Sequence, residues 1–178
     1  MALKPTIFKF VLNLADLDRS RFEELSVTVA QHPSETIERM MVRVAAYCLN
    51  YEPELTFTRG LSENDEPDLW AHHLDGRISH WIEVGEPSPE RLRKAARGAD
   101  ALSVYAFNSR VPVWWRQNSE ALAASGASIW QIDWPDAVKL GALAERTATF
   151  TITLSRPSVF IASDRGEVEL GLIALAEP

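Results

Sequence analysis

Cysteine and histidine are scarce in this chain: Cys48 is the one cysteine among 178 residues, and there are four histidines. A lone cysteine excludes an intramolecular disulfide framework and a zinc site built from several cysteines, and it is typical of a reducing compartment. The adjacent His72 and His73 do not form an obvious metal pair, because neighbouring side chains in a strand point to opposite faces. We expect surface or strand-filling roles for them.

Long apolar runs are absent as well. No run approaches the roughly 18 to 20 residues of a membrane helix, and the N-terminal segment has Lys4 and a strand-like alternation in place of the apolar core of a signal peptide. We therefore expect a cytoplasmic protein without membrane association. Positive charge is in deficit, and the formal net charge of -7 argues against nucleic-acid binding over the whole surface. A local basic patch remains compatible with that charge.

Two common catalytic motifs are missing from the sequence. It has no Gly-x-Ser-x-Gly turn of the kind that exposes a nucleophilic serine, and no glycine-rich loop that could cradle the phosphates of a nucleotide. Serine-based hydrolysis and standard nucleotide binding therefore have no support.

What is present is the composition of one compact domain over residues 1–178, with 46% hydrophobic and 24% charged residues. Alternating and helical spacings indicate a mixed α/β fold. Helices are predicted at 34–49, 89–99, 111–124 and 136–146, and strands at 3–14, 22–30, 55–59, 68–74, 77–84, 102–107 and 129–132, followed by a strand meander to residue 172. The first two strands should pair antiparallel, and Gly60 should end the strand at 55–59. The strand, helix, strand unit over 77–107 predicts a parallel crossover.

The predicted helix at 34–49 carries an acid at the border of its apolar stripe. Ser34 is a suitable N-cap, Glu38 falls about 75° from the centre of the stripe, and Arg39 and Arg43 should point away from it. An acid at this border can reach a site beside the core. The alternative is a solvated glutamate on the flank of the helix.

Two further acids are expected to meet at one end of a small sheet. Asp68 follows Pro67 at the start of a predicted strand, and Glu83 lies near the end of the apolar strand 77–84, on the same face as Trp81. Two carboxylates that repel each other are accommodated when a divalent cation lies between them, and hard oxygen ligands suit Mg²⁺ or Mn²⁺. Such an ion lowers the pKa of a bound water and favours hydrolysis of a phosphodiester. The alternative is a pair of strand-end acids that only stabilise the sheet.

The helix after Glu83 is rich in cations that can neutralise a phosphate. Arg91 lies near the border of its apolar stripe, whereas Lys94 is nearly opposite that stripe. Arg91 is therefore the better placed of the two, and the alternative for the cluster is a solvated helix face.

Five motifs in order resemble the YaeQ family of bacterial proteins: His32-Pro33-Ser34-Glu35-Thr36 with Glu38-Arg39-Met40-Met41, then Phe57-Thr58-Arg59-Gly60-Leu61-Ser62, Glu66-Pro67-Asp68-Leu69-Trp70, Trp81-Ile82-Glu83-Val84-Gly85 and Arg91-Leu92-Arg93-Lys94-Ala95. That family is similar in fold to the PD-(D/E)xK nuclease (restriction-endonuclease-like) superfamily, whose core runs helix, three strands, helix, strand. The predicted order from 34 to 107 fits this core, extended by antiparallel strands at both ends of the chain.

The resemblance implies a metal site for Mg²⁺ or Mn²⁺. It implies Glu38 as the acid of the first helix, Asp68 as the Pro-Asp ligand and Glu83 as the acid of the (D/E)xK element. The sequence departs from the family pattern at Gly85, which occupies the lysine position, so Lys94 or Arg91 would have to supply that charge.

Two functions follow as hypotheses from this resemblance. The first is a Mg²⁺-dependent nuclease or phosphodiesterase acting on nucleic acid. The second is a non-catalytic binding or regulatory domain on a nuclease-like scaffold that has lost its lysine.

Overall fold

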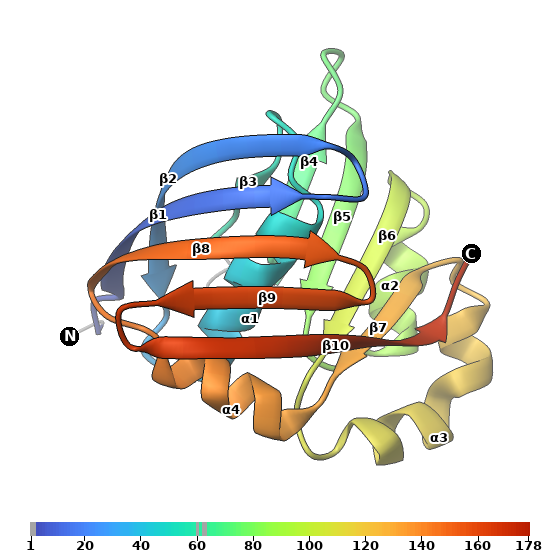
Figure 1. Ribbon diagram of the computed structural model, residues 1–178. Coiled ribbons are helices and arrows are strands. Elements are labelled where there is room, and N and C mark those ends of the chain that lie inside the picture. Colours follow the sequence, from blue (N-terminus) through green and yellow to red (C-terminus); the bar gives the residue numbers. More distant parts are fainter. Residues whose placement is uncertain (1–2, 60, 62–63) are drawn as a thin grey trace.

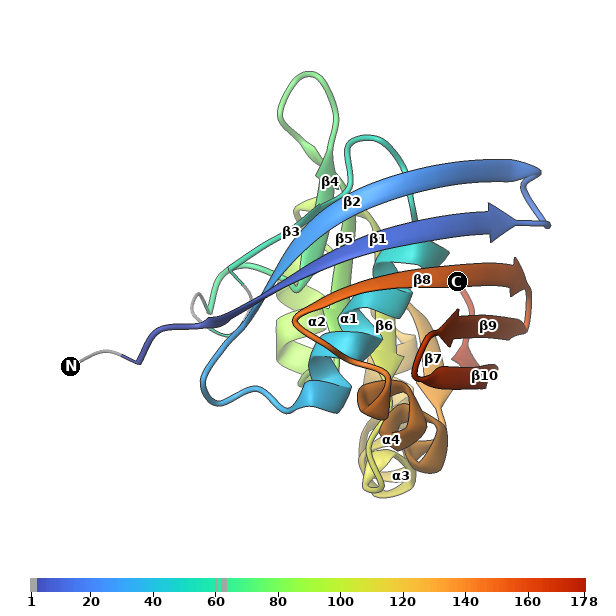
Figure 2. The same cartoon turned by 60° about the vertical axis from the view of Figure 1, so that its left-hand side comes forward.

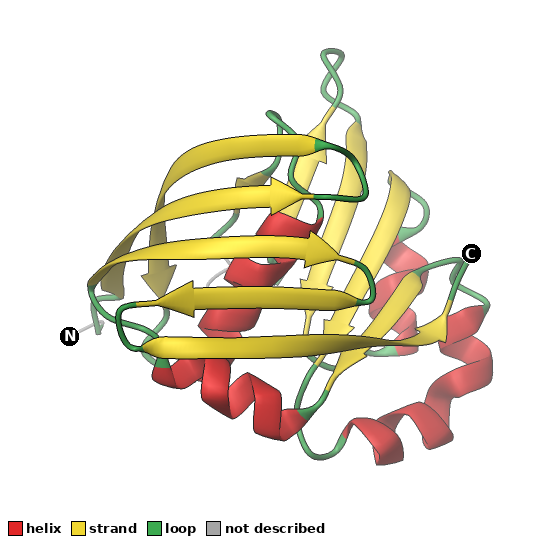
Figure 3. Cartoon of the chain, viewed as in Figure 1, coloured by secondary structure: helices red, strands yellow, loops and turns green. Residues whose placement is uncertain are grey.

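The computed structural model describes residues 3–59, 61 and 64–178, and Gly60, expected to end a strand, lies outside them. Within these residues the chain forms a mixed α/β fold of ten strands and four helices (Figures 1 and 3). The strands form one sheet in the order β2-β1-β8-β9-β10-β7-β6-β5-β4-β3, which curls around α1 and nearly closes (Figure 2). The helices are α1 (Ile37–Leu49), α2 (Pro89–Ala95), α3 (Val111–Ala123) and α4 (Trp134–Ala142).

The two ends of the chain build one half of the sheet. Its strands are β1 (Thr6–Asp16), β2 (Arg21–Gln31), β8 (Thr147–Ser155), β9 (Ser158–Ser163) and β10 (Gly166–Ala176). The predicted antiparallel pairing of the first two strands is confirmed, and β1 also pairs parallel with β8. β10 joins the two halves of the sheet, because its first part pairs with β9 and its last part with β7.

The middle of the chain builds the other half, with β3 (Thr56–Phe57), β4 (Leu69–His72), β5 (Ile78–Val84), β6 (Ala99–Ala106) and β7 (Ser128–Ile132). The predicted parallel crossover is confirmed, since β5 pairs parallel with β6, and β6 pairs parallel with β7. One face of these strands packs against α2 and α3 through Leu92, Trp114 and Leu122. The opposite face packs against α1 and α4.

The start of α2 was predicted correctly from the N-cap serine and the proline that follows it. The side chain of Ser88 accepts a hydrogen bond from the backbone N–H of Arg91, and Pro89 occupies the first turn. The helix is shorter than predicted and ends at Ala95, because β6 begins at Ala99, three residues earlier than expected. Ala99, which was expected at the end of the helix, therefore belongs to the strand.

One expectation for α1 is wrong. The N-cap is Thr36, whose Oγ1 accepts from the backbone N–H of Arg39 at 3.2 Å, whereas the hydroxyl of Ser34 bonds to Nδ1 of His32 at 2.7 Å. Arg39 and Arg43, which were expected to point away from the apolar stripe, are nevertheless not solvated: Arg43 is 3% exposed, and the side chain of Arg39 is 17% exposed. The reason is the curl of the sheet, which surrounds the helix and buries every residue from Met40 to Leu49.

A buried carboxylate anchors the far end of α1. Asp16 is fully buried and accepts hydrogen bonds from Arg19 and Arg156, while Arg156 also donates to the backbone carbonyl of Leu49. Burial alone would raise the pKa of Asp16, but these two arginines outweigh it and hold the pKa at about 2. The ionised aspartate thus ties the β1–β2 turn to the last turn of the helix.

No helix in the described part of the chain is long and apolar enough to cross a membrane.

Candidate functional site

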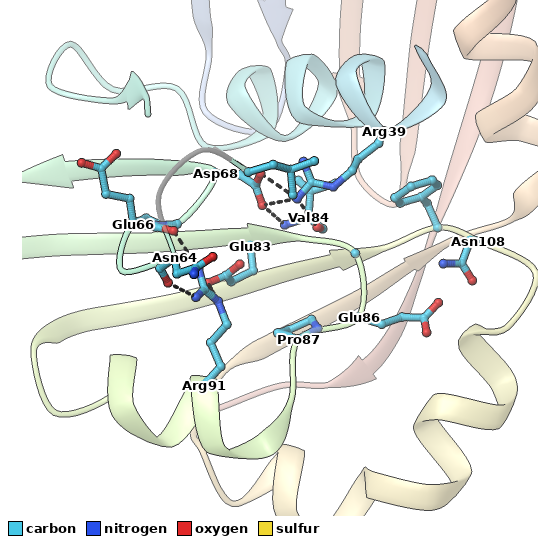
Figure 4. Close-up of a pocket in the computed structure, with 14 residues that line it drawn as sticks. Arg39, Asn64, Glu66, Asp68, Glu83, Val84, Glu86, Pro87, Arg91 and Asn108 are labelled. Carbon is cyan, nitrogen blue, oxygen red and sulfur yellow. Dashed lines mark hydrogen bonds and ion pairs between the residues drawn. The ribbon is translucent and has the colours of Figure 1, made fainter. Parts of the chain in front are cut away.

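A cavity of about 400 Å³ lies at the edge of the sheet where β5 and β6 end (Figure 4). Asp68, Glu83 and Arg91 line it, together with Arg39 from α1 and Glu86 from the β5–α2 loop. Two of the acids expected from the sequence therefore share one cavity, as does the better placed of the two expected cations. Their partners decide what this cavity can do.

Asp68 is 2% exposed, and its carboxylate is held by two donors, the backbone N–H of Val84 and the guanidinium group of Arg39. Its Oδ2 accepts from the backbone N–H of Val84 at 2.7 Å and from Nη2 of Arg39 at 3.0 Å, and its Oδ1 lies 2.8 Å from the same nitrogen. The backbone of Asp68 also pairs with β5, since its N–H donates to the carbonyl of Ile82. Both carboxylate oxygens are thus engaged by the protein itself.

Glu83 is 6% exposed and has its own cation. Its Oε1 accepts from Nε1 of Trp81 at 2.8 Å and from Nε of Arg91 at 2.6 Å. Trp81 and Glu83 lie two residues apart on one face of β5, as the alternation predicted. Burial raises the pKa of Glu83 above its ordinary value, the charge of Arg91 opposes this rise, and the charge of Asp68 adds to it.

Arg91 connects the cavity to the loop that precedes Asp68. Besides Glu83, it donates to the backbone carbonyls of Asn64 and Glu66, and its guanidinium lies 5.8 Å from the ring centroid of Trp81. Lys94 lies elsewhere: its Nζ pairs with Asp65 at 2.9 Å, and its side chain is 78% exposed. The spacing argument that favoured Arg91 over Lys94 agrees with these positions.

Glu38 does not join the other two acids. Gly141 of α4 lies so close that a Cβ added to it would meet Cγ of Glu38 at 3.1 Å, which places this side chain in the contact between α1 and α4. Arg39, the residue after Glu38 and 100° further round the helix, lines the cavity with Asp68 and Glu83 instead.

Sequence reasoning missed the acid that holds the arginines of α1. Glu35 is buried, and its carboxylate pairs with Arg39 at 2.9 Å and with Arg43 at 2.7 Å. The signal was present in the spacing, since Glu35 lies just before the N-cap and stands four and eight residues ahead of Arg39 and Arg43. Glu35, Arg39 and Asp68 form a continuous buried ion-pair chain that ends at the cavity.

At Gly85, where the resemblance would place a lysine, the backbone conformation disfavours any side chain. Gly85 has φ +115, a conformation that side-chain-bearing residues rarely adopt, although no heavy atom lies within 4 Å of an added Cβ. The turn that follows β5 therefore favours glycine at this position.

These residues do not fit a hard divalent cation in the arrangement described. Mg²⁺ requires six oxygen ligands in a near-ideal octahedron, and a protein site supplies at least one or two carboxylates that are free to coordinate. Asp68 and Glu83 already accept from Arg39 and Arg91, and the described residues contain no group of three or more His, Cys, Asp or Glu side chains placed to hold a metal. The cavity is therefore lined by two acid–arginine pairs, Asp68 with Arg39 and Glu83 with Arg91.

The profile of the family described as "YaeQ protein" matches residues 1–172. Curated relatives include "Uncharacterized protein YaeQ" of Escherichia coli (strain K12), 39% identical, and of Salmonella typhi, 40% identical. Both alignments cover 100% of this chain and 99% of the relative.

Two crystal structures of YaeQ proteins are similar to this chain over nearly its full length. The crystal structure of YaeQ protein from Xanthomonas axonopodis pv. citri superposes with a TM-score of 0.94 at 34% identity, covering 98% of this chain and 99% of that one. The YaeQ protein from Pseudomonas syringae gives a TM-score of 0.92 at 39% identity, covering 98% of this chain and 97% of that one. The family match and these alignments run over almost the full length, and this chain therefore belongs to the YaeQ family.

Proposed function

We propose that this chain is a non-catalytic domain that binds the backbone of single-stranded nucleic acid, on a scaffold that resembles PD-(D/E)xK nucleases. The observation that carries the proposal is the pairing of each acid with an arginine, Asp68 with Arg39 and Glu83 with Arg91, beside a basic helix face. The order α1, β3, β4, β5, α2, β6 agrees with the helix, three strands, helix, strand order of that superfamily and supports the scaffold assignment.

The basic face belongs to α2 and the turn after it. An open cavity of about 530 Å³ is lined by Ser88 and Glu90 and by four cations, which are Arg91, Arg93, Lys94 and Arg97. Among the described residues, the guanidinium groups of Arg93 and Arg97 have no ion-pair partner, and both side chains are exposed. On a chain with a net charge of -7, this cluster is a local positive field of the kind that phosphates require.

A more apolar cavity of about 250 Å³ adjoins this face. Trp81, Ile78 and Ala95 line it, and Arg91 and Lys94 belong to both cavities. Single-stranded nucleic acids are bound where a basic groove follows the backbone and aromatic side chains contact unpaired bases. The two neighbouring cavities place cations beside an apolar wall that includes the largely buried Trp81, and this combination supports a single strand over a duplex.

Fluorescence anisotropy with a labelled single-stranded oligonucleotide in EDTA tests the proposal. The double variant Arg93→Gln, Arg97→Gln should bind more weakly, and its salt slope should be smaller by about 1.4, because each lost phosphate contact removes about 0.7 for a single strand. The control double variant Arg116→Gln, Arg165→Gln removes the same charge elsewhere. Equal loss in both variants, or no binding by the wild type, would overturn the proposal.

Metal-dependent phosphodiester hydrolysis is the second candidate, and it would require Arg39 and Arg91 to release Asp68 and Glu83, which they hold in the arrangement described. The observation that favours it is that Asp68 and Glu83 line one cavity closely enough for the charge of Asp68 to raise the pKa of Glu83. Incubation of the wild type with Mg²⁺ or Mn²⁺ and single- and double-stranded DNA and RNA separates the two candidates. Cleavage that is lost in Asp68→Asn would establish hydrolysis, and intact substrate would exclude it and leave the anisotropy experiment to decide on binding.

A further inference from the structure

One edge of the sheet is a long strand with a neighbour on one side only. β2 stands at the end of the strand order and, among the described strands, pairs with β1 alone (Figure 2). This pairing runs from Arg21 to Gln31 without a bulge, and residues 25–31 contain no charged residue and no proline. Proteins usually protect a long edge strand with lysine, proline or a bulge, because its free backbone groups pair readily with another strand. β2 therefore has the features of an edge that accepts a partner strand.

The pairing of β1 shows which backbone groups of β2 lie on this edge. The N–H of Lys9 donates to the carbonyl of Arg146 on the β8 side, so the odd-numbered residues of β1 direct their backbone groups at β8 and the even-numbered ones at β2. In the register of β1 with β2, even-numbered residues stand opposite odd-numbered ones. The even-numbered residues of β2 therefore direct their N–H and C=O groups outward.

The middle of this edge has free backbone groups. Within the part of the chain that the structure describes, the N–H and C=O groups of Glu24, Ser26 and Thr28 have no hydrogen-bond partner. Further along, the carbonyl of Ala30 accepts from Nη2 of Arg43 at 2.9 Å, which agrees with the outward direction of the even-numbered residues. Alternating donors and acceptors of this kind are complementary to an extended strand.

The core is also incomplete beside this edge. Leu25 and Val27 pack against the core, yet they are only half-buried. Their partners on β1, Leu12 and Phe10, are 0% and 2% exposed. The difference arises because β1 has a strand on each side, whereas β2 has a strand on one side. A further strand beside β2 would cover these two side chains, and removal of apolar surface from water favours association.

The charges of β2 restrict the register in which a second copy could pair with it. A two-fold axis at Glu24 would place two glutamates directly opposite each other, and like charges in that position are destabilising. An axis at Ser26 places Glu24 opposite the partner's Thr28 and Ser26 opposite its own copy, and it leaves no like charges opposite each other in the strand. This register also aligns the whole of β2 with its copy and joins outward-directed backbone groups with one another.

Exposed apolar side chains are complementary in the same register. Phe22 is 67% exposed, and it would stand opposite the partner's Ala30. The neighbour of Ala30 on β1 is Ile7, which is 38% exposed. The aromatic ring of one copy would therefore lie over Ala30 and beside Ile7 of the other, on the same face of the sheet. Two exposed hydrophobic side chains of the single chain would thus cover each other.

We propose that β2 pairs antiparallel with β2 of a second copy of this chain, about a two-fold axis at Ser26, so that one sheet continues through both copies. The interface is self-complementary, as a two-fold interface requires. It uses none of the cations of α2, so the proposal does not depend on nucleic-acid binding.

Sedimentation equilibrium of the full chain over a wide range of concentrations, at low ionic strength, tests the proposal. The wild type should change from the mass of one chain to that of two as the concentration rises. Ser26→Lys and Ser26→Glu should each weaken this association by about threefold or more, because each variant sets like charges opposite each other at the axis. An equimolar mixture of the two variants should form mixed dimers more tightly than either variant pairs with itself. A wild type that keeps the mass of one chain, or a mixture no tighter than the single variants, would overturn the proposal.

The matched controls are Thr149→Lys and Thr149→Glu. Thr149 is exposed on β8 and lies in the same row across the sheet, since it stands beside Val11, which stands opposite Ser26. These variants carry the same charges away from the edge and should associate as the wild type does, alone and in mixture. The melting temperatures of all four variants check that they fold. The same response to charge at Thr149 as at Ser26 would show a general charge effect and contradict pairing through β2.

Discussion

Arg39 and Asp68 lie 29 positions apart in the chain, and Nη2 of the arginine is 3.0 Å from Oδ2 of the aspartate. The same nitrogen donates to the backbone carbonyl of Val84 at 2.9 Å, while the carboxylate accepts the N–H of that residue. One ion pair thus fixes α1 to the end of β5 and to the entrance of β4. It also occupies the aspartate that the sequence had suggested as a metal ligand.

Replacing Arg39 by alanine should destabilise the protein strongly. The variant leaves the buried carboxylate of Asp68 without its cation, and breaking one side of a buried pair costs about 3–5 kcal/mol. Chemical denaturation measures the change. The control is Arg77→Ala, which removes the exposed pair with Asp75 and should change the free energy of unfolding by less than about 1 kcal/mol. Similar effects of the two variants would contradict the role given to Arg39.

Substitution of Gly85 should lower the stability of the folded protein, even though no neighbouring atom obstructs an added side chain. Gly85→Ala or Gly85→Lys forces a side-chain-bearing residue to φ +115, and a strained backbone conformation of this kind costs about 1–3 kcal/mol. Gly171→Ala is the matched control, since it lies in β10 without a positive φ and also has no heavy atom within 4 Å of an added Cβ. Thermal denaturation of both variants makes the comparison. A stable Gly85→Lys variant would show that the turn tolerates the missing lysine.

Glu83 should contribute a specific pH dependence to stability. Burial raises its pKa in the folded protein above the ordinary value of 4.5, so the folded state binds this proton more tightly than the unfolded chain does. The associated stability is complete below pH 4.5 and is lost as the pH rises through the raised pKa. Urea denaturation of the wild type and Glu83→Gln across this range should show the wild type losing stability relative to the variant. A difference that does not change with pH would contradict the raised pKa.

Cys48 should be unreactive in the folded protein. It is fully buried, and burial raises the pKa of its thiol to about 12, so the reactive thiolate is scarce at neutral pH. A chromogenic disulfide reagent at pH 8 should titrate one thiol in denaturant and react far more slowly without it. Rapid reaction of the native protein would mean that α1 opens readily.

Sequence patterns predicted the elements whose signals are local. Ser88 and Pro89 marked the start of α2, and the alternation of β5 correctly placed Trp81 and Glu83 on one face. The parallel crossover between β5 and β6 followed from the strand, helix, strand order. The cap and the alternation depend on neighbours within a few residues, and the crossover follows from a general rule for a strand, helix, strand connection, so the sequence alone was sufficient.

The partners of the site residues could not be predicted in the same way. The helical periodicity of α1 predicted only that Arg39 and Arg43 point away from the apolar stripe, because it could not show that distant strands and α4 bury the helix. For the same reason the acid expected beside the site, Glu38, lies against α4, and Glu35 holds the arginines. Spacing identifies which face a residue occupies, but the curl of the sheet decides what that face contacts.

Calorimetric titration of the metal-free wild type with Mn²⁺ tests most directly whether the arginines keep Asp68 and Glu83 from acting as metal ligands. The pairing of these acids with Arg39 and Arg91 predicts no saturable binding in the wild type, and no difference between it and Asp68→Asn. One-site binding of Mn²⁺ in the wild type that disappears in Asp68→Asn would contradict the account.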